Sequence, residues 1–278
     1  MPELPEVQVI VNHLNSQVCA KNINHIDVHL PKIIKNLKPI DFVQMFTNTF
    51  IREIKRVGKY LLFMMSNDYV LQVHLRMEGR FYYVNEDEFI NRAHSHIIFH
   101  LDNQKRLIYY DTRQFGTFHV YHRDDLVSSK ELKKVNKDPL DPEVDGQYFY
   151  DQLHHLKKDI KTTLLDQQRI SGIGNIYANE ILFAAKIHPI VQCTQLTLFD
   201  YQNIYQHAKR ILRDSIDHDG TSIHTFQIDQ DRVGSYQNCL QIHGRDKQLC
   251  YQCNNPVKKI KLNGRGTYFC EHCQKSKD

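Results

Sequence analysis

Four cysteines near the C-terminus constrain the fold of this chain more than any other feature. Two residues separate Cys250 from Cys253, two separate Cys270 from Cys273, and sixteen lie between the pairs. This spacing is typical of a zinc site in which four thiolates surround one ion. Because protein would occupy all four positions, we expect one structural Zn²⁺ rather than a catalytic metal.

The segment between the cysteine pairs is predicted to form a β-hairpin. Residues 257–262 and 267–269 have the composition of short strands. Asn263-Gly264 is a strong turn signal between them, because both residues tolerate positive φ. Arg265 would then lie at or beside the tip of the hairpin.

Positive charge is concentrated in the same part of the chain. Residues 240–278 hold eight Lys/Arg and three Asp/Glu, a local charge of +5 in a chain whose net charge is +4. Lys258, Lys259 and Lys261 line the incoming strand. A cationic hairpin suits a nucleic-acid backbone. A zinc-stapled protein–protein module and a merely solubilising face are the alternatives.

A glycine turn precedes a predicted helix in the middle of the chain. Gly172 and Gly174 come directly before residues 176–185, which have an apolar helical face. Glycines at a helix N-terminus let backbone N–H groups approach a phosphate, although such a turn can also simply connect two helices. We expect further helices over 153–165 and 200–215.

The first half of the chain is predicted to be rich in β-structure. Residues 23–121 contain several alternating segments at hairpin spacing, which favours an antiparallel sandwich. Residues 131–145 are polar, carry two prolines and are the expected hinge. His94 and His96 would share a strand face; we interpret them as surface histidines rather than a metal site.

Length and composition limit the remaining choices. A chain of 278 residues with 41% hydrophobic residues predicts about two domains. It lacks an apolar run of ~18 residues for a membrane span. It also lacks the basic and apolar start of a secretory signal, which favours the cytoplasm. Seven cysteines are an odd number for a disulfide framework.

The N-terminal stretch MPELPEVQVI has the pattern of a helix start. Pro5 suits the first helical position, Glu6 suits the first turn, and an apolar stripe runs over residues 7–14. This pattern accounts for Pro5 and Glu6. It requires neither Pro2 nor Glu3.

Three motifs together resemble the bacterial formamidopyrimidine-DNA glycosylases: PELPEV at the start, GIGNIYANE in the middle, and the four-cysteine hairpin at the end. The resemblance spans the whole chain in order. It implies an α+β fold with an antiparallel β-sandwich and flanking helices over 1–133, a helix–two-turns–helix domain over 134–238, and the zinc hairpin over 239–278. Leu4 stands where the endonuclease VIII branch typically has glycine, which favours oxidised purines over oxidised pyrimidines.

The resemblance implies a bifunctional DNA glycosylase and abasic-site lyase that acts on 8-oxoguanine and formamidopyrimidines in base-excision repair. Removal of Met1 would expose the secondary amine of Pro2, and a terminal amine has a pKa of ~7.7–8.0. That amine would attack the sugar, form an iminium and lead to β,δ-elimination. Glu3 matches the general acid, and we expect DNA closure to desolvate it. Lys59 and Arg265 complete the implied catalytic set.

The resemblance also implies a set of DNA contacts. Met77, Arg113 and Phe115 would fill the gap left by the flipped nucleotide; strand core is the alternative for Met77 and Phe115, but MEGR and RQFG favour exposed turns. The other implied contacts are Glu6, which would hold Glu3 or a water, Lys59 and His74 at phosphates, Glu78 beside the extruded base, and Lys161, Asn175, Thr221, Thr225 and Lys259.

One position departs from the family pattern, because His243 replaces the tyrosine of Tyr-Gly-Arg, and we expect its phosphate contact to depend on pH.

Three other functions stay open. The first is a non-catalytic DNA-damage binder, which would result if Met1 were retained and the Pro2 nitrogen were an amide. The second is an oxidised-pyrimidine glycosylase, and the third is a zinc-hairpin interaction protein. The expected partner is duplex DNA with oxidised purines or abasic sites. The expected state is a monomer in the bacterial cytoplasm, associated with the nucleoid and not with a membrane.

Overall fold

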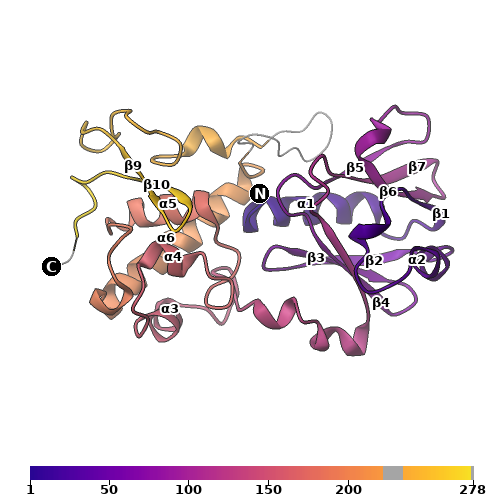
Figure 1. Cartoon of the computed structure of the whole chain (residues 1–278), viewed down its shortest axis with the longest axis horizontal. Coiled ribbons are helices and arrows are strands. Elements are labelled where there is room, and N and C mark those ends of the chain that lie inside the picture. The colour runs from indigo at the N-terminus through magenta and orange to yellow at the C-terminus, as the bar shows by residue number, and fades with distance from the viewer. Residues whose placement is uncertain (222–233, 277–278) are drawn as a thin grey trace. The chain divides into compact units, whose positions relative to one another are not determined.

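The computed structural model describes residues 1–221 and 234–276, so Thr225 lies outside the described residues. The chain forms two compact units (Figure 1). The first unit comprises residues 1–133 and 219–235, and the second comprises 134–218 and 236–278. Among the described residues, no helix is long and apolar enough to cross a lipid bilayer.

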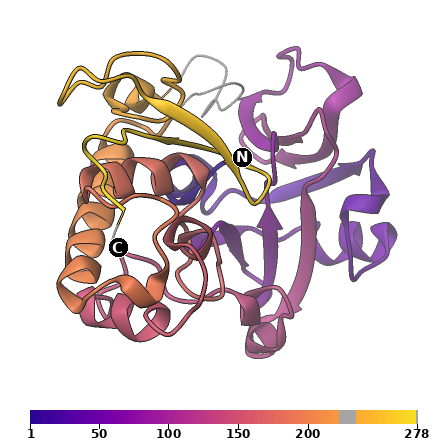
Figure 2. The same ribbon diagram turned by 60° about the vertical axis from the view of Figure 1, so that its left-hand side comes forward.

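Two antiparallel sheets make up the first unit, which confirms the predicted β-sandwich (Figure 2). One sheet has the order β1 (Ile23–Val28), β6 (Ser95–Leu101), β7 (Lys105–Tyr110) and β5 (Arg80–Asn85). The other has the order β2 (Ile51–Val57), β3 (Tyr60–Met65), β4 (Tyr69–His74) and β8 (Thr117–His122). Tight turns join β3 to β4 and β6 to β7, with positive φ at Asp68 and Gln104.

The core of the first unit lies between the sheets and under two helices. Phe63, Phe81 and Phe118 are buried among aliphatic side chains from both sheets, and their rings contact each other edge to face or at a tilt. Helix α1 (Leu4–Val18) packs against β2 and β3, and α2 (Pro39–Phe46) packs against β1. The buried stripe of α1 therefore fixes the start of the chain against the sandwich.

Short 3₁₀ turns connect the strands: η1 (Pro31–Ile33), η2 (Arg92–His94), η3 (Arg123–Ser128) and η4 (Leu132–Lys134). The prediction that His94 and His96 are surface residues on one strand face is wrong. His94 belongs to η2, and His96 in β6 is buried, where its Nε2 lies 2.7 Å from the carbonyl oxygen of Asp111. This backbone partner satisfies the ring inside the sheet.

Helices build most of the second unit: α3 (Gly146–Leu153), α4 (Ile160–Leu164), α5 (Asn175–Ala184) and α6 (Leu198–Asp217). The expected single helix over 153–165 is wrong, because α3 ends at Leu153 and α4 begins at Ile160. The carboxylate of Asp159 accepts the Thr162 N–H at 2.7 Å and so caps a new helix. The helix predicted over 200–215 lies within α6.

The C-terminal hairpin is present as predicted. Strands β9 (Lys258–Leu262) and β10 (Arg265–Phe269) pair in antiparallel register, with Arg265 opposite Leu262. Asn263 and Gly264 form the turn with φ of 45° and 78°. Two further 3₁₀ turns, η5 (Cys193–Gln195) and η6 (Tyr236–Cys239), complete the unit.

Candidate functional site

The chain terminus is held at the start of α1. Helix α1 begins at Leu4, so Pro5 is its second residue rather than its first, and Glu3 is the N-cap. The Glu6 carboxylate accepts the backbone N–H of Glu3 at 2.8 Å. Pro2 is buried immediately before this cap. A terminus that is usually frayed therefore has a defined position.

The same Glu6 carboxylate joins the terminus to a segment 215 residues further along the chain. Its other oxygen accepts both the backbone N–H and the hydroxyl of Thr221, each at 2.9 Å. A Cβ at Gly220 would lie 3.1 Å from Glu6, and the φ of Gly220 is +77°. Glycine is therefore suited to this close approach. We expected Glu6 to hold either Glu3 or a water, and in the structure it holds the backbone of Glu3.

Burial shapes the electrostatics around the terminus. Desolvation lowers the pKa of the Met1 amine, and Lys59 adds to this effect, whereas Glu3 and Glu6 oppose it. A lowered pKa increases the neutral, nucleophilic fraction of an amine. Glu3 is only 3% exposed. Its desolvation therefore exists in the free protein and does not require DNA closure, contrary to our expectation.

His74 lies at the end of β4 as a buried, neutral hydrogen-bond donor. Its Nδ1 accepts the backbone N–H of Arg76 at 2.9 Å, which assigns the ring proton to Nε2. Burial lowers the pKa of His74 to about 3, and the charges of Arg76 and Lys59 contribute to the same shift. The ring can therefore donate to an anion without carrying a charge.

Two exposed loops of the first unit carry the predicted gap-filling side chains. Met77 lies in the β4–β5 turn and Phe115 in the β7–β8 loop, and their exposures of 38% and 53% exclude the strand-core alternative. The Arg113 guanidinium lies 4.9 Å from the centre of the Phe115 ring. The Thr112 hydroxyl donates to the Glu78 carboxylate and links the loops.

In the second unit, two predicted DNA contacts lie against the hairpin. The Lys161 ammonium donates to the carbonyl of Gly266 at 3.0 Å and to the Thr267 hydroxyl at 2.6 Å. The Asn175 amide donates to the same carbonyl at 3.1 Å. Lys161 is 1% exposed, whereas Arg265, next to Gly266, is exposed. These bonds fix the hairpin backbone beside Arg265.

Two residues of the motif GIGNIYANE have roles that sequence reasoning missed. The Glu180 carboxylate accepts the backbone N–H groups of Gln241, Ile242 and His243 at 2.8–2.9 Å. Burial raises the pKa of Glu180, and these bonds oppose the shift. Asn179 donates to Nδ1 of His243 at 2.7 Å, which places the ring proton on Nε2. Both residues therefore hold the segment 241–243 that precedes the hairpin.

The four cysteine sulfurs converge on one point. All four Sγ atoms lie within 4.8 Å of one another, with 3.4 Å between Cys253 and Cys270 and 3.9 Å between Cys250 and Cys273. A tetrahedral zinc with Zn–S bonds of about 2.3 Å places its sulfurs about 3.8 Å apart. The residues therefore fit one structural Zn²⁺. No other such cluster occurs in the described part of the chain.

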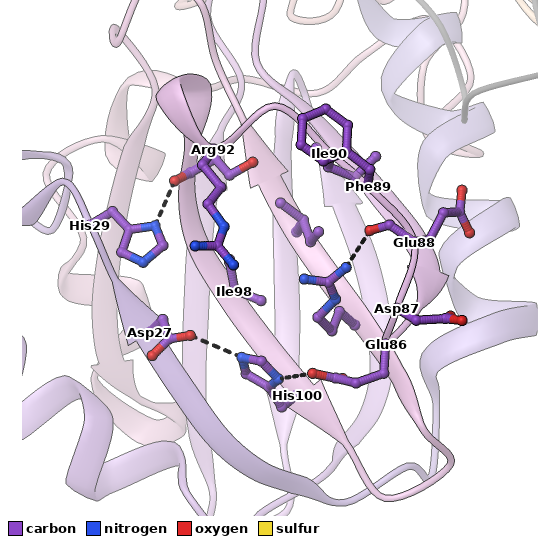
Figure 3. A pocket seen from close by; sticks show the side chains of 13 residues that line it. Asp27, His29, Glu86, Asp87, Glu88, Phe89, Ile90, Arg92, Ile98 and His100 are labelled. Carbon is purple, nitrogen blue, oxygen red and sulfur yellow. Dashed lines mark hydrogen bonds and ion pairs between the residues drawn. The ribbon is translucent and has the colours of Figure 1, made fainter.

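The first unit also has a pocket of about 440 Å³ on its β1–β6–β7–β5 sheet (Figure 3). The ring of His100 sits between Asp27 and Glu86, at 3.0 and 2.8 Å from their oxygens. None of the predicted site residues lines this pocket.

The structure combines a Pro2 buried at a helix start, two linked exposed loops and a cationic hairpin whose four cysteines fit one Zn²⁺. These are features of the class of zinc-containing nucleic-acid-binding proteins. Residues 1–118 match the model for the formamidopyrimidine-DNA glycosylase N-terminal domain. Residues 135–227 match its H2TH domain, and 241–275 match a zinc finger found in FPG and IleRS. The formamidopyrimidine-DNA glycosylase of Ureaplasma parvum serovar 3 is 52% identical over 99% of this chain and 100% of its own.

This chain belongs to the formamidopyrimidine-DNA glycosylase family. A Lactococcus lactis FPG mutant, solved in complex with Fapy-dG-containing DNA, matches with a TM-score of 0.93 and 33% identity, over 99% of this chain and 100% of that one. The wild-type L. lactis enzyme in complex with oxidised-pyrimidine-containing DNA matches with a TM-score of 0.91 and 32% identity, with the same coverage.

Zinc removal tests the role of the hairpin. Cys253→Ser, or chelation of the ion, should lower the affinity for lesion-containing duplex DNA by about 10-fold or more, because the hairpin loses the bonds that shape it. Fluorescence anisotropy measures the affinity, and a colorimetric assay confirms the metal content. Cys239→Ser, outside the cluster, should keep zinc and affinity. Unchanged affinity in verified zinc-free protein would refute this role.

His74 should make stability fall as the solution becomes acidic. In the unfolded chain the ring binds a proton below its ordinary pKa of ~6.5, whereas in the folded protein it stays neutral down to about 3. Its contribution should therefore be complete above pH 6.5 and decline by up to about 1.4 kcal/mol per pH unit between 6.5 and 3.

Urea unfolding measured between about pH 7 and pH 4 tests this contribution. His74→Gln should flatten the pH dependence, and His155→Gln, which replaces an exposed ring on another element, serves as the control. Equal slopes for the wild type and His74→Gln would contradict the prediction.

Proposed function

We propose that this protein excises 8-oxoguanine and formamidopyrimidines from duplex DNA and then cleaves the abasic strand. Family membership and the L. lactis complex with Fapy-dG-containing DNA support the substrate class. The main support for the mechanism is the position of Pro2. This residue is buried at the start of α1, next to Glu3, whose backbone N–H donates to the Glu6 carboxylate. Such an arrangement gives a flexible amine the fixed position that a nucleophile needs.

The reaction begins once Met1 has been removed. The nitrogen lone pair of Pro2 forms a bond to C1′ of the damaged nucleotide, and the base leaves with its bonding electrons and takes up a proton from solvent. The Pro2 nitrogen then loses its own N–H proton to solvent and regains its lone pair. Glu3 donates a proton to the ring oxygen as the sugar opens, which leaves an iminium ion. Loss of a C2′ proton then expels the 3′ phosphate, and a second elimination expels the 5′ phosphate. Lys59 stabilises the phosphate charge.

The linked loops stabilise the DNA from which the base has been flipped. Flipping costs a few kcal/mol of lost stacking and pairing. Met77 and Phe115, both exposed, replace part of the stacking, and Arg113 donates hydrogen bonds to the orphaned cytosine. Glu78, held by Thr112, lies beside the extruded base.

The second unit supplies phosphate contacts. Arg265 and Lys259 are exposed on the hairpin, and cations of this kind fix the register of a protein on the duplex. Lys161 and Asn175 serve this function by fixing the backbone of Gly266. Nε2 of His243 adds a further hydrogen-bond donor.

An oxidised pyrimidine is a second candidate substrate. The L. lactis enzyme has been solved with oxidised-pyrimidine-containing DNA, which supports some tolerance in this fold. A protein that retained Met1 would bind damage without cutting, because the Pro2 nitrogen would be an amide. We further propose that the protein acts as a monomer on chromosomal DNA in the bacterial cytoplasm.

Borohydride trapping tests the nucleophile. Protein whose mass confirms the loss of Met1, mixed with an 8-oxoguanine duplex and sodium borohydride, should form a covalent adduct visible on a denaturing gel. A protease-removable N-terminal extension should abolish the adduct, because it converts the amine to an amide, and its removal to expose Pro2 should restore it. A parallel thymine-glycol duplex measures the pyrimidine activity.

Tight lesion binding without an adduct, from protein that begins at Pro2, would reject the enzyme and favour the non-catalytic binder. An adduct that survives the N-terminal extension would instead assign the nucleophile to another residue. Both results differ from a failure to bind, which would remove DNA from the function altogether.

Replacement of the hairpin arginine tests the phosphate contact. Arg265→Ala should weaken binding about equally for different sequences and reduce the dependence of log K on log salt by about 1, because one phosphate contact is lost. Lys258→Ala is the matched control, since Lys258 pairs with Glu271 at the far end of the same hairpin. A salt dependence equal to that of the wild type would contradict the contact.

A further inference from the structure

One buried carboxylate organises the whole β7–β8 loop. Asp111 is 0% exposed. Its Oδ1 accepts the backbone N–H of Arg113 at 3.0 Å. Its Oδ2 accepts the backbone N–H groups of Phe115 and Gly116, each at 2.9 Å, and the hydroxyl of Tyr109 at 3.1 Å. Both side chains that this loop presents for gap filling are thus held through their own backbone amides.

The hydroxyl that binds this carboxylate also touches the neighbouring loop. A Cβ at Gly116 would lie 1.7 Å from Oη of Tyr109, and a Cβ at Gly79 would lie 2.4 Å from the same atom. Gly79 closes the β4–β5 turn that presents Met77. No side chain larger than hydrogen fits at either glycine without displacement of the tyrosine. Tyr109 therefore contacts the β4–β5 turn at Gly79 and the β7–β8 loop at Gly116.

Tyr109 and Asp111 are themselves held by buried contacts. The Tyr109 ring is 0% exposed and packs edge to face on Phe118, with 4.8 Å between the ring centres. The backbone N–H of Asp111 donates to the carbonyl of His94 at 3.0 Å, and His96 lies 2.7 Å from the carbonyl of Asp111. Burial and the adjacent carboxylate raise the pKa of Tyr109, so its hydroxyl remains a donor.

Neither loop has a conformation that an unsupported chain favours. Arg76 has a φ of 57° and Gln114 a φ of 58°, one in each loop. Residues other than glycine rarely adopt positive φ, and such positions persist when the surroundings determine them. Asp111 binds the backbone amides on both sides of Gln114, and the Tyr109 hydroxyl lies against Gly79 at the end of the turn that contains Arg76.

We propose that Tyr109 and Asp111 form a positioning pair that sets Met77, Arg113 and Phe115 in their gap-filling geometry at the same time. The inference rests on the proposed function, because it assigns a purpose to the shape of the two loops. Three side chains that enter a duplex together lose less conformational freedom if one buried hydrogen-bonded pair holds both of their loops beforehand. The pair acts through the loops and does not itself touch DNA.

The test compares two reactions of the same variants. Tyr109→Phe removes one hydroxyl and keeps the ring, and Asp111→Asn halves the oxygen acceptors. Single-turnover excision from an 8-oxoguanine·cytosine duplex should slow on the order of 10-fold or more, because the gap-filling side chains are misplaced. Borohydride trapping on a single-stranded abasic oligonucleotide, which has no opposite base and no duplex gap, should change by less than about 3-fold.

A matched control is available on the same sheet. Tyr83→Phe in β5 also deletes a hydroxyl, one that accepts from Asn103 at the β6–β7 turn, and it should leave both reactions unchanged. Melting temperatures of all variants identify loss of folding. If Asp111→Asn fails to fold, Tyr109→Phe alone carries the test.

A double-mutant cycle separates positioning from general damage. If Tyr109 acts through the loops, Tyr109→Phe should have a much smaller effect in a Met77→Ala/Phe115→Ala background than in the wild type. Additive effects, equal slowing of both reactions, or no slowing in Tyr109→Phe would overturn the proposal. A wild-type protein without excision or trapping would instead refute the proposed function itself.

Discussion

The buried carboxylate of Glu6 is the interaction on which the candidate site depends. It accepts hydrogen bonds from the backbone of Glu3 and from the backbone and hydroxyl of Thr221. A carboxylate in a buried place is costly unless its oxygens are satisfied. Here the same bonds that satisfy it fix the first residues of the chain. The apolar stripe of α1 then anchors this arrangement to the sandwich, so that a chain terminus becomes a defined part of a site.

The same principle recurs in the rest of the molecule, because buried polar side chains shape exposed loops. Glu180 accepts hydrogen bonds from three backbone N–H groups of residues 241–243, and Lys161 donates to the carbonyl of Gly266, beside Arg265. Asp111 collects three backbone N–H groups and a hydroxyl in the first unit. In each case a buried, hydrogen-bonded side chain holds the backbone of an exposed segment. That segment therefore loses less conformational entropy when a ligand binds.

Sequence reasoning succeeded where the signal is local. Asn263-Gly264 predicted the hairpin turn because only a few residues accept positive φ, and the cysteine spacing predicted the metal site because two C-x₂-C pairs supply four ligands. It failed where partners are distant. The break before α4 depends on the cap by Asp159, which an apolar periodicity does not reveal. The burial of His96 depends on the carbonyl of Asp111, which follows β7.

The amino-acid sequence by itself determined the class of fold, the zinc cysteines and the family, because spacing, turn residues and motifs are local properties. It also placed Met77 and Phe115 in turns. Only the tertiary structure showed that Lys161 supports the hairpin, that Glu3 is desolvated without DNA and that His74 is neutral. The physical reason is that desolvation and hydrogen bonding of buried groups depend on segments that meet only after folding, such as Glu6 with Thr221.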